Sequence, residues 1–140
     1  MQDNLQNLYE VSKEHVEKAQ DFIETAKMSL ENEKYNNAIR CAYYACYHLI
    51  YSIIVLDGVI ITDRNKHKAT IEYLRDNYIE TGVFKEKHDA NIENARVIRN
   101  AVDYKPGVFA SIEVAQEIYE DALAFFTDVN DYIINRLNMK

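Results

Sequence analysis

The scarcity of turn-forming residues constrains the fold of this chain more than any other feature. Its 140 residues include three Gly and one Pro. All-β proteins need many tight turns, and tight turns depend on Gly and Pro. The composition therefore predicts an all-α fold, and the length suits one domain with a buried core.

Apolar residues recur three and four positions apart in five segments, which predicts an up-and-down bundle of four to five helices. The first helix is expected from Ser12 to Glu31, with Ser12 as its N-cap. Residues 1–11 are expected to form a loosely ordered extension or a short helix before a domain that spans residues 12–140. The other helices are expected at residues 36–56, 65–80, 85–104 and 111–137, with Gly58, Gly82 and Pro106 as breakers after the first three and Ser111 as N-cap of the last.

The second of these predicted helices is apolar on two sides. One side carries small and aliphatic residues, and the other carries Tyr43, Tyr44, Tyr47 and Tyr51, with His48 beside them. Such a helix is either the buried centre of a bundle or is covered by a partner chain. The tyrosine side therefore has two interpretations: it packs in the core, or it forms a dimer surface or a wall on which bases stack.

Charge and cysteine usage indicate a cytoplasmic protein without membrane contact. The formal net charge of −7 argues against non-specific coating of nucleic acid or anionic lipid, so any nucleic-acid contact must be local. Cys41 and Cys46 point about 140° apart on one helix and cannot pair there, and free thiols fit a reducing compartment. The N-terminus is polar, and the apolar run 49–61 is too short to span a bilayer.

Motifs for metals and cofactors are missing from the sequence. Di-iron bundles use Glu-x-x-His pairs, and none of the four His has a Glu three positions before it. Three scattered Gly cannot build a phosphate-binding loop, and no nucleophile elbow occurs. We therefore expect neither a metal nor a cofactor.

A polar stripe on the fourth predicted helix is the most informative local feature. Arg96, Arg99 and Asp103 lie beside the apolar face, and Arg99 is the closest of them to its edge. One interpretation is an exposed ion pair between Arg99 and Asp103, which contributes about a few tenths of a kcal/mol. The other is a half-buried arginine that grips a phosphate with two N–H groups.

Three segments together resemble the HEPN family, helical nucleotide-binding domains common in prokaryotic defence and toxin–antitoxin operons. They are residues 35–48, which include Tyr-Tyr-Ala-Cys-Tyr-His, the pair Lys66-His67 with residues 78–82, and Arg99-Asn100-Ala101-Val102-Asp103-Tyr104. The last segment resembles the Arg-x-x-x-Asp-Tyr ending of a subgroup of small uncharacterised members. The resemblance covers about residues 12–135 and implies a homodimer with two copies of Arg99 in a shared cleft.

The resemblance also implies a ligand site for a nucleotide or RNA. Its candidate residues are Arg99, Asp103, Tyr104, Arg96, Asn100, Tyr44, Tyr47, His48, Lys66 and His67. Many HEPN proteins are metal-independent RNases in which a His follows the Arg after four to six residues, and no His follows Arg99. Asp103 and Tyr104 are poor substitutes at neutral pH, because their ordinary pKa values are about 3.9 and 10.

We therefore expect weak or no RNase activity, and Arg99 is the one catalytic candidate. The leading hypothesis is a nucleotide- or RNA-binding or partner-binding module of a defence or toxin–antitoxin-like system. A nucleotidyltransferase is the expected partner, and Tyr104 is a candidate acceptor of its nucleotide. The alternatives are a degenerate RNase toxin and a purely structural helical dimer.

Overall fold

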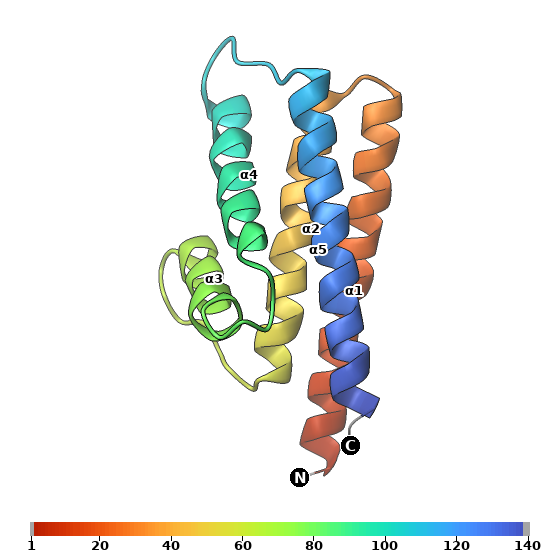
Figure 1. Ribbon diagram of the computed structural model, residues 1–140, viewed down its shortest axis with the longest axis vertical. Coiled ribbons are helices and arrows are strands. Elements are labelled where there is room, and N and C mark those ends of the chain that lie inside the picture. The colour runs from red at the N-terminus through yellow and green to blue at the C-terminus, as the bar shows by residue number, and fades with distance from the viewer. Residues whose placement is uncertain (1, 139–140) are drawn as a thin grey trace.

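The computed structural model describes the backbone of residues 2–138 and the side chains of residues 6–138. Within that range the chain is all-α, as predicted. The elements are α1 (Gln2–Glu31), α2 (Tyr35–Leu56), α3 (Lys66–Leu74), the π-helical turn η1 (Arg75–Ile79), α4 (Glu86–Tyr104) and α5 (Ile112–Asn138). The long helices alternate in direction, and α3 with η1 lies below α4 and beside the lower half of α2 (Figure 1).

Helix α2 is the buried centre of the bundle, which confirms the first interpretation of its two apolar sides. It packs against α1, α3, α4 and α5. Ala38, Ala42, Ala45 and Leu49 are fully buried on its aliphatic side, which lets α5 approach closely. By length and composition α2 could also cross a membrane, but 61% of its most apolar window is buried inside the bundle, as in the core helix of a globular protein.

Helix α1 begins ten residues earlier than predicted. The helix is continuous from Gln2, and Ser12 is not an N-cap. Its hydroxyl is buried and donates to the carbonyl oxygen of Ser52 at 2.8 Å, so it joins α1 to α2. The serine that sequence pattern assigns to a helix end therefore serves as an interhelical contact, because residues 2–11 contain no breaker.

The third predicted helix is interrupted. After Leu74 the backbone makes an i→i+5 turn, in which the amide of Glu80 donates to the carbonyl of Arg75 at 2.9 Å. Residues five apart in a regular α-helix point about 140° away from each other. The wider turn brings the hydroxyls of Tyr73 and Tyr78 onto one carboxylate oxygen of Asp57, each at 2.7 Å.

The predicted boundaries of the other helices are close to those observed. Gly58 and Gly82 adopt φ values of +71° and +81°, as expected for residues that end helices. The hydroxyl of Ser111 accepts from the amide of Val114 at 3.2 Å and caps α5. Cys41 and Cys46 are buried free thiols, also as predicted.

Candidate functional site

Arg99 lies between α4 and the tyrosine side of α2. Its side chain is only 13% exposed, so it is not the exposed ion pair of the first interpretation. Its Nη2 donates to the hydroxyl of Tyr44 at 2.5 Å, and its Nη1 donates to Asn100 Oδ1 at 2.6 Å. The guanidinium carbon lies 5.2 Å from the ring centre of Tyr44 and 5.4 Å from that of Tyr43. These contacts fix the guanidinium in one orientation.

The fixed guanidinium retains unused hydrogen-bonding capacity. An arginine has five N–H groups, two of them on each terminal nitrogen. Tyr44 and Asn100 take one from each terminal nitrogen, so one N–H on each is left over. Nε is buried without a hydrogen-bond partner in the described part of the chain, and Asp103 Oδ2 lies 3.5 Å from it. One N–H on each of the two terminal nitrogens is enough for a guanidinium to bind two oxygens of one phosphate.

Asp103 is shared between two arginines. Arg40 on α2 hydrogen-bonds to its Oδ1 through Nε, while Arg99 faces its Oδ2. These three groups sum to one positive charge. Arg96 adds no net charge because it pairs with Glu93 at 2.6 Å. A local net charge of +1 is therefore present on a protein of net charge −7, as expected for a small local site.

His67 brings an imidazole to this site from a different helix. It lies at the start of α3, and its Nδ1 is 2.8 Å from the hydroxyl of Tyr43. Its ring stacks on Tyr47, with ring centres 4.3 Å apart and planes 26° apart. Burial first, and then the charges of Arg99 and Arg96, lower the pKa of His67 below its ordinary value of 6.5. The sequence has no His after Arg99, and the structure supplies an imidazole to the same two tyrosines from α3 instead.

The remaining predicted residues are distributed around this centre. Tyr104 is 73% exposed at the end of α4 and lies near enough to Arg99 to interact with its charge. Lys66 is exposed next to His67. His48 lies on the α1 side of the same aromatic cluster: its Nδ1 is 3.0 Å from Nδ1 of His15, its ring stacks on Phe22, and it meets Tyr47 edge-on with ring centres 6.1 Å apart.

Two residues of the site, Arg40 and Tyr43, were not among the predicted ligand residues. Arg40 and Tyr43 precede Tyr44 and Tyr47 by four residues each on α2, so all four share one side of the helix. This spacing was the signal that could have found them. The spacing does not reveal the interaction partners of these two residues. Arg40 pairs with Asp103, 63 residues away along the chain, and Tyr43 bonds to His67, 24 residues away.

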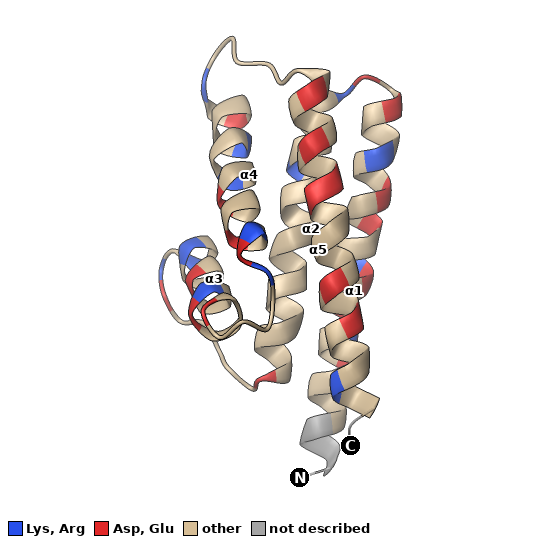
Figure 2. Cartoon of the chain, in the orientation of Figure 1, with Lys and Arg blue, Asp and Glu red and all other residues tan. Residues whose placement is uncertain are grey.

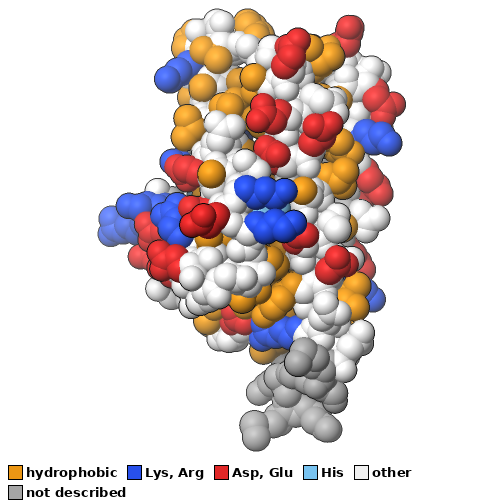
Figure 3. Space-filling view, viewed as in Figure 1, with side chains coloured by type: hydrophobic (Ala, Val, Ile, Leu, Met, Phe, Trp, Pro, Cys, Tyr) orange, Lys and Arg blue, Asp and Glu red, His pale blue; other side chains and the backbone are white. Residues whose placement is uncertain are grey.

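A groove next to Arg96 is wide enough to admit a ligand toward the site. A groove of about 180 Å³ between α3 and α4 adjoins the site, because Arg96 forms part of its wall with Lys68, Arg75 and Glu72. Charges of both signs gather over α3, whereas acidic side chains follow α5 (Figures 2 and 3). An anionic ligand that reaches Arg99 is therefore expected to approach from the side of α3 and α4.

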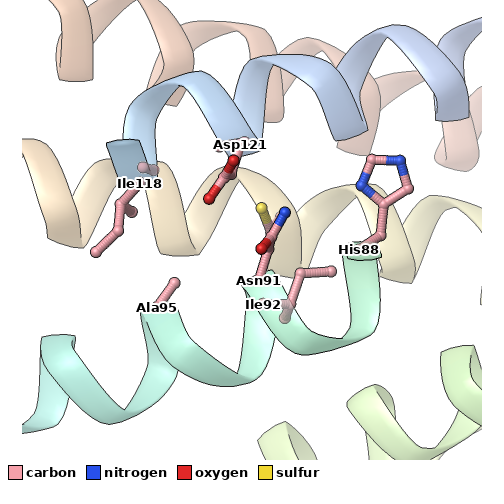
Figure 4. A pocket seen from close by; sticks show the side chains of 9 residues that line it. His88, Asn91, Ile92, Ala95, Ile118 and Asp121 are labelled. Atoms are coloured by element: carbon pink, nitrogen blue, oxygen red, sulfur yellow. The ribbon is translucent and has the colours of Figure 1, made fainter. Parts of the chain in front are cut away.

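A second cavity, between α2, α4 and α5, is too small for a nucleotide. Its volume is about 10 Å³, enough for roughly one water molecule. Asn91 and Asp121 point toward one another across it, with His88 at one end (Figure 4). His88 is fully buried and bonds to Asp128 through Nε2 at 2.6 Å, which ties α4 to α5. This cavity is a feature of core packing.

The fold and the site define a class: a helical bundle that holds a nearly buried arginine against a tyrosine-rich central helix. A family model described as the HEPN domain matches residues 12–132. The chain therefore belongs to the HEPN family, whose functions are generally related to nucleotides and RNA. A search of curated proteins finds no match.

Proposed function

We propose that this HEPN domain binds RNA or a nucleotide, and that Arg99 holds a phosphate. The observation that carries the proposal is a guanidinium that is 13% exposed, fixed by Tyr44 and Asn100, and still has one free N–H on each terminal nitrogen. A donor that is already in place loses little conformational freedom when the ligand arrives. Its paired N–H groups match two oxygens of one phosphate.

The test is the binding of a fluorescein-labelled, unstructured 20-nucleotide RNA, followed by fluorescence anisotropy. We expect Arg99→Ala to weaken binding at least about tenfold, the effect of losing a charge-assisted hydrogen bond of roughly 1.5–3 kcal/mol. Arg99→Lys keeps the charge but loses the paired donors, so it should also weaken binding. Lys27→Ala removes an exposed positive charge from α1 and is the matched control. Equal affinity of Arg99→Ala and the control would refute the proposal.

We propose that two copies of the chain associate through the tyrosine side of α2. Tyr44, Tyr47, His48 and Tyr51 are half-buried there, although they belong to the central helix of the bundle. A twofold axis next to this face would bring two copies of Arg99 together. Tyr51→Glu should shift the mass measured by light scattering from dimer to monomer, whereas Leu123→Glu on α5 should not. A monomeric wild type contradicts this part of the proposal.

A nucleotidyltransferase partner is supported by the position of Tyr104. This side chain is 73% exposed at the end of α4, so a second protein can reach its hydroxyl. The tyrosine oxygen would attack the α-phosphorus of a nucleoside triphosphate, the bond to the pyrophosphate would break, and the phenolic proton would pass to the partner's base. A mass increase of one nucleotidyl group that Tyr104→Phe abolishes supports this role. A wild type that stays unmodified when incubated with a nucleotidyltransferase encoded by a neighbouring gene, or a genome that encodes none beside it, opposes it.

A further inference from the structure

Tyr43 determines which nitrogen of His67 carries a proton. The tyrosine is 1% exposed, and Nδ1 of His67, at 2.8 Å, is its one hydrogen-bond partner in the described structure. Burial raises the pKa of Tyr43 well above 10, so the hydroxyl keeps its proton at neutral pH. A buried O–H without an acceptor is costly, so Tyr43 donates to Nδ1. The neutral ring then carries its own proton on Nε2.

This Nε2–H group remains available to a ligand. No hydrogen bond to Nε2 is present among the described residues, and Nε2 is not among their buried unpartnered atoms. The ring is half-exposed and is held in its plane by stacking on Tyr47 and Tyr43, with ring centres 4.3 and 5.7 Å away. His67 thus presents one oriented donor toward the solvent.

The imidazole and the guanidinium of Arg99 contact the same two tyrosines. The ring of His67 lies 5.7 Å from the ring of Tyr43 and 6.3 Å from that of Tyr44, and the guanidinium carbon lies 5.4 and 5.2 Å from them. The charged or titratable groups facing His67 are Tyr43, Tyr44 and Tyr47 from α2 and Arg96 and Arg99 from α4. Burial first, and then the positive charges of Arg99 and Arg96, lower the pKa of His67 below its ordinary value of 6.5, so the neutral ring predominates at pH 7.

We propose that His67 is a second phosphate ligand beside Arg99, fixed by Tyr43 as a neutral Nε2–H donor, and that the site holds an RNA phosphodiester without cleaving it. The inference rests on the proposed function. Cleavage through the 2′-hydroxyl needs a base with a free lone pair, and Nε2 has none in this tautomer. Tyr43 is thus a positioning residue that acts through His67.

The charge of the site indicates the class of phosphate. Arg40 and Arg99 together with Asp103 leave one positive charge and His67 adds none, while the charge of Lys66, next to His67, lies on an exposed side chain and is screened by water. A phosphodiester carries one negative charge, whereas a terminal phosphate carries close to two at neutral pH. A terminal phosphate would bring a second negative charge that the site does not neutralise and would lose more hydration on binding, so we expect an internal phosphate of a strand to be favoured over a mononucleotide.

The tautomer can be observed directly. Long-range ¹H–¹⁵N spectra of the full chain labelled in histidine, with His67 assigned through His67→Gln, should show the neutral Nε2–H form at pH 7. In Tyr43→Phe the two neutral forms should mix, because the donor to Nδ1 is gone. An Nδ1–H form or an imidazolium in the wild type at pH 7 would overturn the inference.

RNA-binding measurements on variants of His67 and Arg99 distinguish a failure of this inference from a failure of the proposed function. With the labelled 20-nucleotide RNA, His67→Leu should weaken binding about tenfold, whereas His67→Gln keeps an N–H donor and should stay within about threefold of the wild type. Lys27→Ala, at an exposed lysine of α1, is again the control. If Arg99→Ala weakens binding and His67→Leu does not, the role of His67 is refuted and the proposed function stands. If neither variant changes binding, both are refuted.

Competition and product analysis test the ligand class and the lack of cleavage. The dinucleoside monophosphate ApA should displace the labelled RNA at a lower concentration than AMP does, and the reverse order overturns the charge argument. Overnight incubation of the wild type with the RNA in EDTA should leave it intact. Products with 2′,3′-cyclic phosphate ends that disappear in His67→Gln would show a free lone pair on Nε2 and overturn the inference.

Discussion

Replacing Asp103 by Asn should strengthen RNA binding and weaken the fold at the same time. Asp103 is the one negative charge in contact with both Arg40 and Arg99, so its removal raises the local charge from +1 to +2. A phosphate bound on the outer side of the guanidinium would lie roughly 8 Å from this carboxylate. Coulomb's law gives a repulsion of about 0.5 kcal/mol at that distance in water and about 2 kcal/mol at an effective dielectric constant of 20.

The side chain of Asp103 is 15% exposed, so a value between these limits applies. We expect a gain of about 1 kcal/mol, or roughly fivefold in Kd, that shrinks as salt is raised. The stability should fall by about 1 kcal/mol, because Arg40 is 38% exposed and loses a partly screened pair while Arg99 loses a nearly buried neighbour.

Anisotropy with the labelled RNA at low and high salt measures the first effect, and urea unfolding measures the second. Glu113→Gln makes the same charge change in the first turn of α5 and should leave RNA binding unaltered, and its own cost to stability through the helix dipole is about 0.3–1 kcal/mol. Weaker RNA binding by Asp103→Asn would refute the reasoning, since it would mean that the carboxylate aims Arg99 rather than opposing the ligand. If Asp103→Asn and Glu113→Gln increased the RNA affinity equally, the effect would come from the net charge of the protein and not from the position of Asp103.

Three further perturbations test how the bundle is held together. Asp57→Asn should lower the unfolding free energy by about 2–4 kcal/mol in urea, because Asp57 accepts two tyrosine hydroxyls at 2.7 Å and pairs with Arg136 at 2.6 Å. Unchanged stability would contradict this. Burial, with the charges of His15 and Lys18, lowers the pKa of His48 from 6.5 to about 4, so the unfolded chain binds the extra proton first and stability should fall as the pH drops from 6.5 to 4. His48→Gln should flatten that slope, and an identical slope in the variant would count against it. Ser12→Ala should cost about 1 kcal/mol in the same urea assay through the loss of its buried hydrogen bond, and a neutral result would show that this contact is unimportant.

The polar stripe on α4 shows how far sequence reasoning reaches into the site. Helical periodicity placed Arg99 at the edge of the apolar face, and the structure confirms that it is nearly buried. The same reasoning paired Asp103 with Arg99 alone. In the structure Arg40 is the closer partner, because α2 and α4 cross there and bring together residues 63 positions apart.

The contacts of His67, in contrast, could not be predicted from helical periodicity. The family resemblance named His67 as a candidate ligand residue, but no sequence pattern links it to Arg99, because the two meet the same tyrosines only where α3 packs against α2. Tyr43 was assigned to an aromatic face, and its role depends on a single hydroxyl that points at His67. Helical periodicity therefore predicted where Arg99 lies, whereas the contact between Tyr43 and His67 follows only from the packing of α2 against α3.

The sequence by itself determined the helices, the central position of α2 and the arginine next to the apolar edge. These follow from local rules: few breakers, apolar spacings of three and four, and capping residues. Only the tertiary structure decided the wide turn of η1, the interhelical role of Ser12, the sharing of Asp103 and the tautomer of His67. Each of these depends on a hydrogen bond or ion pair between distant segments, and such contacts form only once hydrophobic packing has fixed how the helices lie against each other.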